Sequence, residues 1–134
     1  MSTFTLEIAT PERLLLREQV SEAQVPAKRG ELGVRPEHAP LIAELGIGVL
    51  SYVSSGGRKA LVVAGGVVEV LPDRCRVLAD VAEYADEVDA KRAQEAERRA
   101  SERLTHPELG VDVARALNAL RRAQARVNAT EQGR

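Results

Sequence analysis

The distribution of glycine and proline divides this 134-residue chain into two parts. Eight of the ten glycines and five of the six prolines lie before residue 85. Because both residue types favour turns, we expect the first part to consist of short segments with frequent reversals. After Tyr84 the pattern changes to apolar residues at helical spacing. We therefore expect one domain over residues 1–84 and a second over residues 85–134.

Apolar and polar side chains alternate through most of the first part, as in half-buried β-strands. The residues SSGG at positions 54–57 separate two such segments and predict a β-hairpin. The expected strands lie at residues 4–8, 14–16, 20–25, 49–53, 59–64, 68–70 and 75–79, the third with an irregularity. This pattern predicts an all-β N-terminal domain, a sandwich or a flattened barrel.

The second part predicts two helices that pair as an antiparallel hairpin. Asp86 or Asp89 can cap the first helix, which carries a stripe of alanines that ends at Leu104. Pro107 and Gly110 lie in the break between the helices. The second helix places five residues on one face, with Ala116 and Ala123 beside them: Val113, Leu117, Leu120, Gln124 and Val127. Because an alanine stripe buries little apolar area, we predict a weakly held hairpin that changes partners at modest cost.

No set of residues predicts catalysis or metal binding. The chain lacks the Gly-Lys-Ser/Thr sequence of a phosphate-binding loop. His38 and His106 have no second histidine or cysteine at metal-ligand spacing. The single Cys75 excludes an intrachain disulfide, fits a reducing compartment and lies in an alternating strand, where a core role is expected. Gly65 and Gly66 indicate a turn, a bulge or a close backbone approach.

Composition also argues against two classes of partner. The net charge is −1, and only three aromatic residues are present, which disfavours nucleic-acid binding. No apolar run is long enough to span a bilayer, and the first residues do not resemble a signal peptide, so we expect no membrane insertion. The second helix is basic, which suits an acidic partner, although a solvated face explains it equally well.

Three sequence blocks are specific when taken together: GELGVRPEHAPL at positions 30–41, GGVVEV at 65–70 with VLAD at 77–80, and DAKRA at 89–93. They resemble the G-E-L-G-x-x-P-x-H-A-P-L loop, the G-G-x-x-E-V and V-L-A-D strands and the D-x-x-R-A helix start of the epsilon subunits of F-type ATP synthases. The order and spacing agree over nearly the whole chain, and the first block is the most diagnostic.

The resemblance implies a ten-stranded sandwich with a helical hairpin, and a non-catalytic role in the central stalk. The sandwich would bind the gamma subunit and the c-ring, with Glu31 and His38 at the c-ring end. The hairpin would extend to the alpha/beta catalytic ring and inhibit ATP hydrolysis through basic side chains, namely Arg115, Arg121, Arg122 and Arg126. The location implied is the cytoplasmic face of the bacterial plasma membrane, as a peripheral subunit.

Some bacterial members bind regulatory ATP on the folded hairpin, although no cofactor is required. The matching positions here are Glu83, Val88, Asp89, Arg92, Ala93, Arg99, Arg122 and Arg126. Val88 departs from the usual Ile or Leu. Arginine forks suit phosphate oxygens, but the same arginines also suit the inhibitory contact. The alternatives to the stalk role are a free-standing ATP-binding sensor and a β-domain adaptor with a coiled-coil tail.

Overall fold

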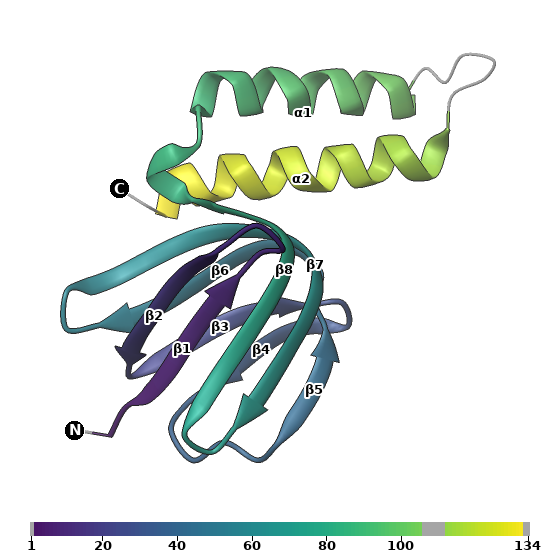
Figure 1. Ribbon diagram of the computed structural model, residues 1–134. Coiled ribbons are helices and arrows are strands. Elements are labelled where there is room, and N and C mark those ends of the chain that lie inside the picture. The colour runs from purple at the N-terminus through teal and green to yellow at the C-terminus, as the bar shows by residue number, and fades with distance from the viewer. Residues whose placement is uncertain (1, 106–111, 133–134) are drawn as a thin grey trace.

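The computed structural model describes residues 2–105 and 112–132 and divides them into a β-sandwich and a helical hairpin (Figure 1). The strands are β1 (Phe4–Ala9), β2 (Leu14–Val20), β3 (Glu22–Ala27), β4 (Gly30–Val34), β5 (Leu41–Glu44), β6 (Ile47–Ser54), β7 (Gly57–Leu71) and β8 (Arg74–Tyr84). The 3-10 turn η1 (Ala85–Glu87) leads to α1 (Ala90–Thr105) and α2 (Val113–Gln132). The irregularity expected at residues 20–25 is a break between two strands, because β2 ends at Val20 and β3 begins at Glu22.

Two long strands, β7 and β8, belong to both layers of the sandwich. Residues 57–64 of β7 pair with β6, whereas residues 67–70 pair with β5. Residues 74–78 of β8 pair with β1, and the rest of β8 follows β7 into the other layer. One layer is therefore β2-β1-β8-β7-β5 and the other is β8-β7-β6-β3-β4. The eight described strands thus fill about ten strand positions, which agrees with the expected sandwich.

The change of layer in β7 occurs at Gly65 and Gly66, which have φ angles of 73° and 123°. A Cβ atom on Gly66 would lie 2.0 Å from the carbonyl oxygen of Leu78. Only glycine combines this backbone conformation with so close an approach to the neighbouring strand. The close backbone approach expected at this pair is confirmed.

The core lies between the two layers and consists of inward-facing aliphatic side chains with two aromatic ones. Phe4 and Tyr52 are the largest fully buried side chains, and Cys75 is buried beside them, as expected. Burial raises the pKa of the Cys75 thiol to about 12, so the group stays protonated at neutral pH. The side chains of the core are therefore those at the inward positions of the strand alternation that the sequence shows.

Both helices begin at an aspartate that caps the helix. The amide of Arg92 donates a 3.1 Å hydrogen bond to Asp89 Oδ1, so Asp89 rather than Asp86 caps α1. Asp112 accepts the equivalent bond from the amide of Arg115 at the start of α2. The helix start predicted at Asp89 is confirmed. His106, Pro107 and Gly110 lie outside the described residues.

The expected apolar face of α2 is only partly right. Ala116 and Ala123 are buried and Leu120 and Val127 are half-buried, as expected, but Val113 and Leu117 remain 57% and 37% exposed, and Gln124 is exposed as well. The other two buried residues of α2, Ala125 and Ala129, are alanines outside the predicted face. On α1 the buried residues are Ala93 and Ala100, because α1 packs mainly on α2. Small side chains let two helices and a sheet approach closely, whereas leucines on that face would hold them apart.

Candidate functional site

The hairpin rests on the outer face of the sandwich through the C-terminal half of α2. Ala125 and Ala129 pack against Ala60 and Val62 of β7 and against Ala85 of η1. Ile47, Val49 and Val88 surround this cluster. Figure 1 shows α2 lying between the sandwich and α1, so that α1 forms the outer layer. On the hairpin side, α2 therefore contributes only small side chains to this contact.

One ion pair joins the two parts next to this alanine contact. The guanidinium of Arg126 on α2 lies 2.7 Å (Nη2) and 2.8 Å (Nε) from Glu83 Oε1 on β8. Both side chains are about one-third exposed, so this pair is only partly screened by solvent. The pair therefore fixes the position of α2 relative to the last strand.

A pocket of about 580 Å³ opens beside this ion pair, between η1, α1 and α2; we call it the hairpin pocket. Seven of the eight residues predicted to bind ATP line it: Glu83, Val88, Asp89, Arg92, Ala93, Arg99 and Arg126. Glu87 and Ala96 complete the lining. Arg122, the eighth predicted residue, is half-buried and is not among the lining residues. The fold thus brings together residues from four elements, namely β8, η1, α1 and α2.

The charges of the hairpin pocket are balanced, but they are not all paired. Glu83 is bound to Arg126, and Asp89 accepts the amide of Arg92. Among the described residues no ion pair is recorded for the guanidinium of Arg92 or of Arg99. Because they lie seven residues apart on α1, they share one face, about 10.5 Å apart along the helix axis. This spacing leaves two cationic groups available to an elongated polyanion.

Near the hairpin pocket, Tyr84 anchors the end of β8. Its hydroxyl donates a 3.0 Å hydrogen bond to the carbonyl oxygen of Leu15 on β2. Burial, followed by the nearby charge of Glu87, raises the pKa of Tyr84 above its usual value. The hydroxyl therefore keeps its proton and this bond at neutral pH, which holds β8 in place where the hairpin begins.

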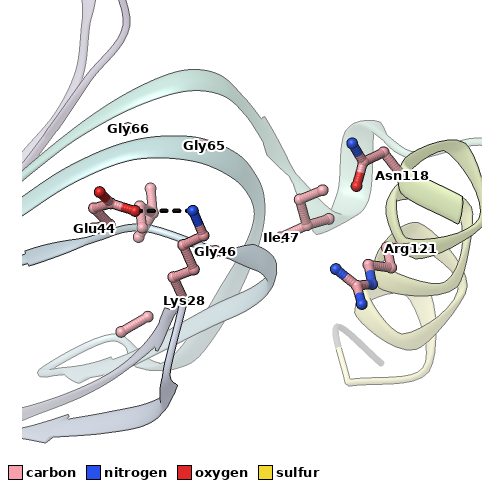
Figure 2. A pocket seen from close by; sticks show the side chains of 10 residues that line it. Lys28, Glu44, Gly46, Ile47, Gly65, Gly66, Asn118 and Arg121 are labelled. Atoms are coloured by element: carbon pink, nitrogen blue, oxygen red, sulfur yellow. Dashed lines mark ion pairs between the residues drawn. The ribbon is translucent and has the colours of Figure 1, made fainter. Parts of the chain in front are cut away.

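The four arginines predicted for inhibition have different environments on α2. Arg126 is bound to Glu83, Arg122 is half-buried, and Arg115 and Arg121 are exposed. Arg121 and Asn118 lie over a second pocket of about 540 Å³ between α2 and the sandwich; we call it the crevice (Figure 2). The sandwich side of the crevice carries Lys28 and Glu44, whose charged groups lie 3.1 Å apart.

The two residues expected at the c-ring end, Glu31 and His38, are not brought into one pocket. Glu31 is exposed on β4 and lines a smaller pocket under α2 that also includes Arg121. His38 lies in the loop between β4 and β5, where its Nδ1 is 2.7 Å from the carbonyl oxygen of Ala39. That nitrogen must carry the proton to donate this bond. In the same loop Glu37 has a φ of 64°, and its amide donates to the carbonyl oxygen of Pro72.

An exposed apolar row crosses the outer face of the β2-β1-β8-β7-β5 layer. Leu14 pairs with Ala9, Ala9 with Leu78, and Leu78 with Val67. Leu78 is 58% exposed, and Ile42, on β5 at the edge of the same face, is 70% exposed. Beside the apolar row runs a charged row in which Glu7 binds both Arg17 and Arg76. We call the residues Leu14, Ala9, Leu78 and Val67 the apolar row; Ile42 pairs with Glu69 of the charged row and lies diagonally next to Val67.

Sequence reasoning missed the apolar row, although a signal was present. In β8 the inward positions are Cys75, Val77 and Ala79, so Leu78 is an apolar residue at an outward position. Val67 is likewise out of phase with Val68 and Val70. Apolar residues at outward positions on several strands indicate an interaction surface. What the sequence did not reveal is that these strands are neighbours.

Within residues 2–105 and 112–132, no cluster of three or more His, Cys, Asp or Glu side chains is arranged to hold a metal ion. None of the described helices combines the length and the hydrophobicity that a membrane span requires. The arrangement instead offers two polar pockets beside a docked helix and an apolar row on the opposite layer.

Comparison with known families agrees with this division into two parts. Residues 3–85 match the family described as ATP synthase, Delta/Epsilon chain, beta-sandwich domain. Residues 86–131 match ATP synthase, Delta/Epsilon chain, long alpha-helix domain. The fold and the two matches define a class of protein, a β-sandwich followed by a docked helical hairpin.

The similarity extends to individual proteins. The ATP synthase epsilon chain of Solibacter usitatus is 55% identical over 125 residues, which is 93% of each chain. That of Syntrophomonas wolfei is 46% identical, over 97% of this chain and 96% of the relative. The chain belongs to the epsilon subunits of F-type ATP synthase.

A solved structure of Euglena gracilis mitochondrial ATP synthase, comprising OSCP, F1 and the c-ring, contains a chain with the same fold. It superposes with a TM-score of 0.85 at 21% identity and covers 97% of this chain and 82% of that chain. A chain in the central stalk and c-ring structure of Tetrahymena thermophila mitochondrial ATP synthase gives a TM-score of 0.55 at 16% identity.

Proposed function

We propose that this chain is a non-catalytic, peripheral subunit of the central stalk whose hairpin is a movable, ATP-sensitive inhibitor of ATP hydrolysis. The observation that carries the proposal is the docked hairpin, which brings Glu83, Asp89, Arg92, Arg99 and Arg126 around one pocket. In the docked state the hairpin would leave the alpha/beta ring free to hydrolyse ATP. In the extended state its arginines would contact acidic segments of that ring.

The small contact between hairpin and sandwich supports a movable element. A buried methyl group contributes about 0.8 kcal/mol, against roughly 1.5–3 kcal/mol for a buried leucine. Ala125 and Ala129 each bury only one methyl group against the sandwich. Their contribution, together with one ion pair, is small enough for a partner with a larger interface to offset. Hydrogen exchange should therefore show weaker protection in α2 than in the strands; equal protection would contradict this step.

ATP would stabilise the docked state by binding in the hairpin pocket. Its phosphates would contact Arg92 and Arg99, the two cations of the hairpin pocket that form no ion pair with a described residue. Arg126, held by Glu83, would add a third contact from α2, so the nucleotide would connect both helices. Binding only to the docked state shifts the equilibrium toward it in proportion to the ATP concentration.

Titration of the full chain with ATP tests this step. Arg92→Ala should weaken ATP binding about tenfold or more, since it removes a charge-assisted contact. Arg115→Ala, an exposed arginine of α2 outside the pocket, is the matched control and should bind as the unchanged protein does. Arg122→Ala tests the one predicted residue that does not line the pocket. If the protein does not bind ATP at millimolar concentrations, the proposed regulation by ATP is contradicted, but the proposed role in the central stalk is not.

The sandwich would provide the two fixed contacts of the subunit. We propose the apolar row as the surface for the gamma subunit, because exposed apolar side chains on four adjacent strands favour a permanent protein partner. Glu31, on β4, and His38, in the loop between β4 and β5, would face the c-ring on the cytoplasmic side of the membrane. Substitution of His38, followed by measurement of proton-coupled ATP synthesis in reassembled enzyme, tests that placement. Unchanged coupling would mean that this loop only shapes a turn.

A further inference from the structure

The crevice between α2 and the sandwich is a second polar pocket that the ATP proposal does not use. It shares no lining residue with the hairpin pocket, which lies at the other end of the α2 contact. Its volume of about 540 Å³ falls within the usual range of small-molecule sites. Three glycines, Gly46, Gly65 and Gly66, contribute only backbone to its wall.

Two cationic side chains face the crevice from opposite sides. Figure 2 shows Lys28 and Glu44 on the sandwich side, and Arg121 and Asn118 reaching in from α2. No ion pair is recorded for Arg121 with a described residue. Lys28 binds Glu44, but both side chains are about 70% exposed. A pair so exposed is weak, so Lys28 can turn to an incoming anion at little cost.

We propose that the crevice binds a small phosphorylated molecule, with its phosphate between Lys28 and Arg121. A guanidinium fork, an ammonium group and the Asn118 amide provide donors from both sides, a combination that suits a phosphate group. The lining carries two positive charges against the single negative charge of Glu44. Ile47, half-buried at the mouth, provides an apolar contact for the rest of the ligand.

Such a ligand would connect the sandwich to the half of α2 that the alanine contact does not reach. The alanine contact and the Arg126–Glu83 pair hold the C-terminal half of α2, whereas the crevice lies under the half that contains Asn118 and Arg121. A phosphate bound to both sides exists only when the hairpin is docked. It therefore stabilises the docked state independently of the hairpin pocket.

The test is a titration of the full ¹⁵N-labelled chain, followed by amide chemical shifts, with inorganic phosphate and with ribose 5-phosphate as probes. Shifts should concentrate at Lys28, Gly46, Gly65, Asn118 and Arg121. Lys28→Ala and Arg121→Ala should each weaken binding about tenfold. Arg115→Ala on α2 and Arg92→Ala in the hairpin pocket are matched controls and should leave binding unchanged. Arg121→Ala could also weaken binding indirectly, by undocking α2. Lys28 belongs to the sandwich, so weaker binding in Lys28→Ala cannot be explained by the loss of an α2 side chain.

Tighter binding of ribose 5-phosphate than of inorganic phosphate would identify an organic phosphate as the ligand. Tighter binding of inorganic phosphate would support the phosphate contact but contradict the contact with Ile47. The proposal is overturned if neither probe shifts the crevice signals, or if the shifts appear only around Arg92 and Arg99. Binding that survives both Lys28→Ala and Arg121→Ala would overturn it as well. None of these outcomes depends on whether ATP binds in the hairpin pocket.

Discussion

Arg126 of α2 and Glu83 of β8 form the only ion pair recorded between the hairpin and the sandwich among the described residues. Two nitrogens of the guanidinium reach the same carboxylate oxygen, at 2.7 and 2.8 Å. The pair lies where β8 ends and the hairpin begins, beside the alanine contact of α2. The pair therefore connects the hairpin, which we propose to be movable, with the sandwich, which we propose to stay fixed.

Glu83→Gln should loosen the docked hairpin without unfolding the sandwich. The substitution removes the charge of a partly buried pair, which contributes about 1 kcal/mol, so the undocked population should rise roughly fivefold. Hydrogen exchange of α2 amides, with β7 amides as the internal reference, measures this change. Glu102→Gln is the control, because it removes only the exposed Arg98–Glu102 pair on α1. Equal exchange in both variants would mean that the Glu83 pair does not hold the hairpin.

Leu78→Lys should weaken association with the gamma subunit by about tenfold or more. It places a charge in the middle of the apolar row, where a partner would have to desolvate it. Co-purification with gamma, followed by a binding titration, measures the effect. Gln24→Lys adds the same charge to an exposed position of β3, in the other layer, and should bind normally. A Leu78→Lys protein that retains full affinity would move the gamma contact away from the apolar row.

Gly66→Ala should destabilise the sandwich by about 3 kcal/mol, measured as the free energy of unfolding in urea. The added Cβ would approach the Leu78 carbonyl oxygen to 2.0 Å, in a backbone conformation that alanine rarely adopts. Gly33→Ala is the matched control, since its Cβ would meet only the flexible end of Gln24 at 3.4 Å. If the two variants unfold at the same urea concentration, β7 tolerates a different path between the layers.

Cys75 should make the stability of the sandwich fall with pH above about 9. Burial raises the pKa of its thiol from 9.0 to about 12, so the folded protein keeps a proton that the unfolded chain loses. The contribution is fully present below pH 9 and is lost as the pH rises towards 12, at up to about 1.4 kcal/mol per pH unit.

Urea unfolding at several pH values measures this loss. Between pH 8 and pH 10 the stability advantage of the unchanged protein over Cys75→Ala should shrink by roughly 1 kcal/mol. The raised pKa of Tyr52 is present in both proteins and cancels in this difference. A constant difference across this pH range would show that the thiol titrates alike in the folded and unfolded states.

Local patterns predicted the elements of this protein well. Alternation in the first part and helical spacing in the second depend on backbone geometry over a few residues. Asp89 could be recognised as a cap because its effect is limited to the next helical turn. Residues 30–41, 65–70 and 77–80 carried enough specific sequence to indicate the family. The apolar face of α2 was predicted only in part: Ala116 and Ala123 were included, but Ala125 and Ala129 were not, because leucine spacing does not show that an alanine face packs more closely.

The sequence by itself therefore determined the two-part division, the strand and helix segments and the side chains of the sandwich core. These follow from turn residues and periodicity, which act within a few residues of the chain. Only the tertiary structure decided how β7 and β8 serve both layers and which face of α2 meets the sandwich. It also brought Glu83 to Arg126, and Lys28 across from Arg121. Contacts between residues more than forty positions apart depend on how whole elements pack, and no local pattern carries that information.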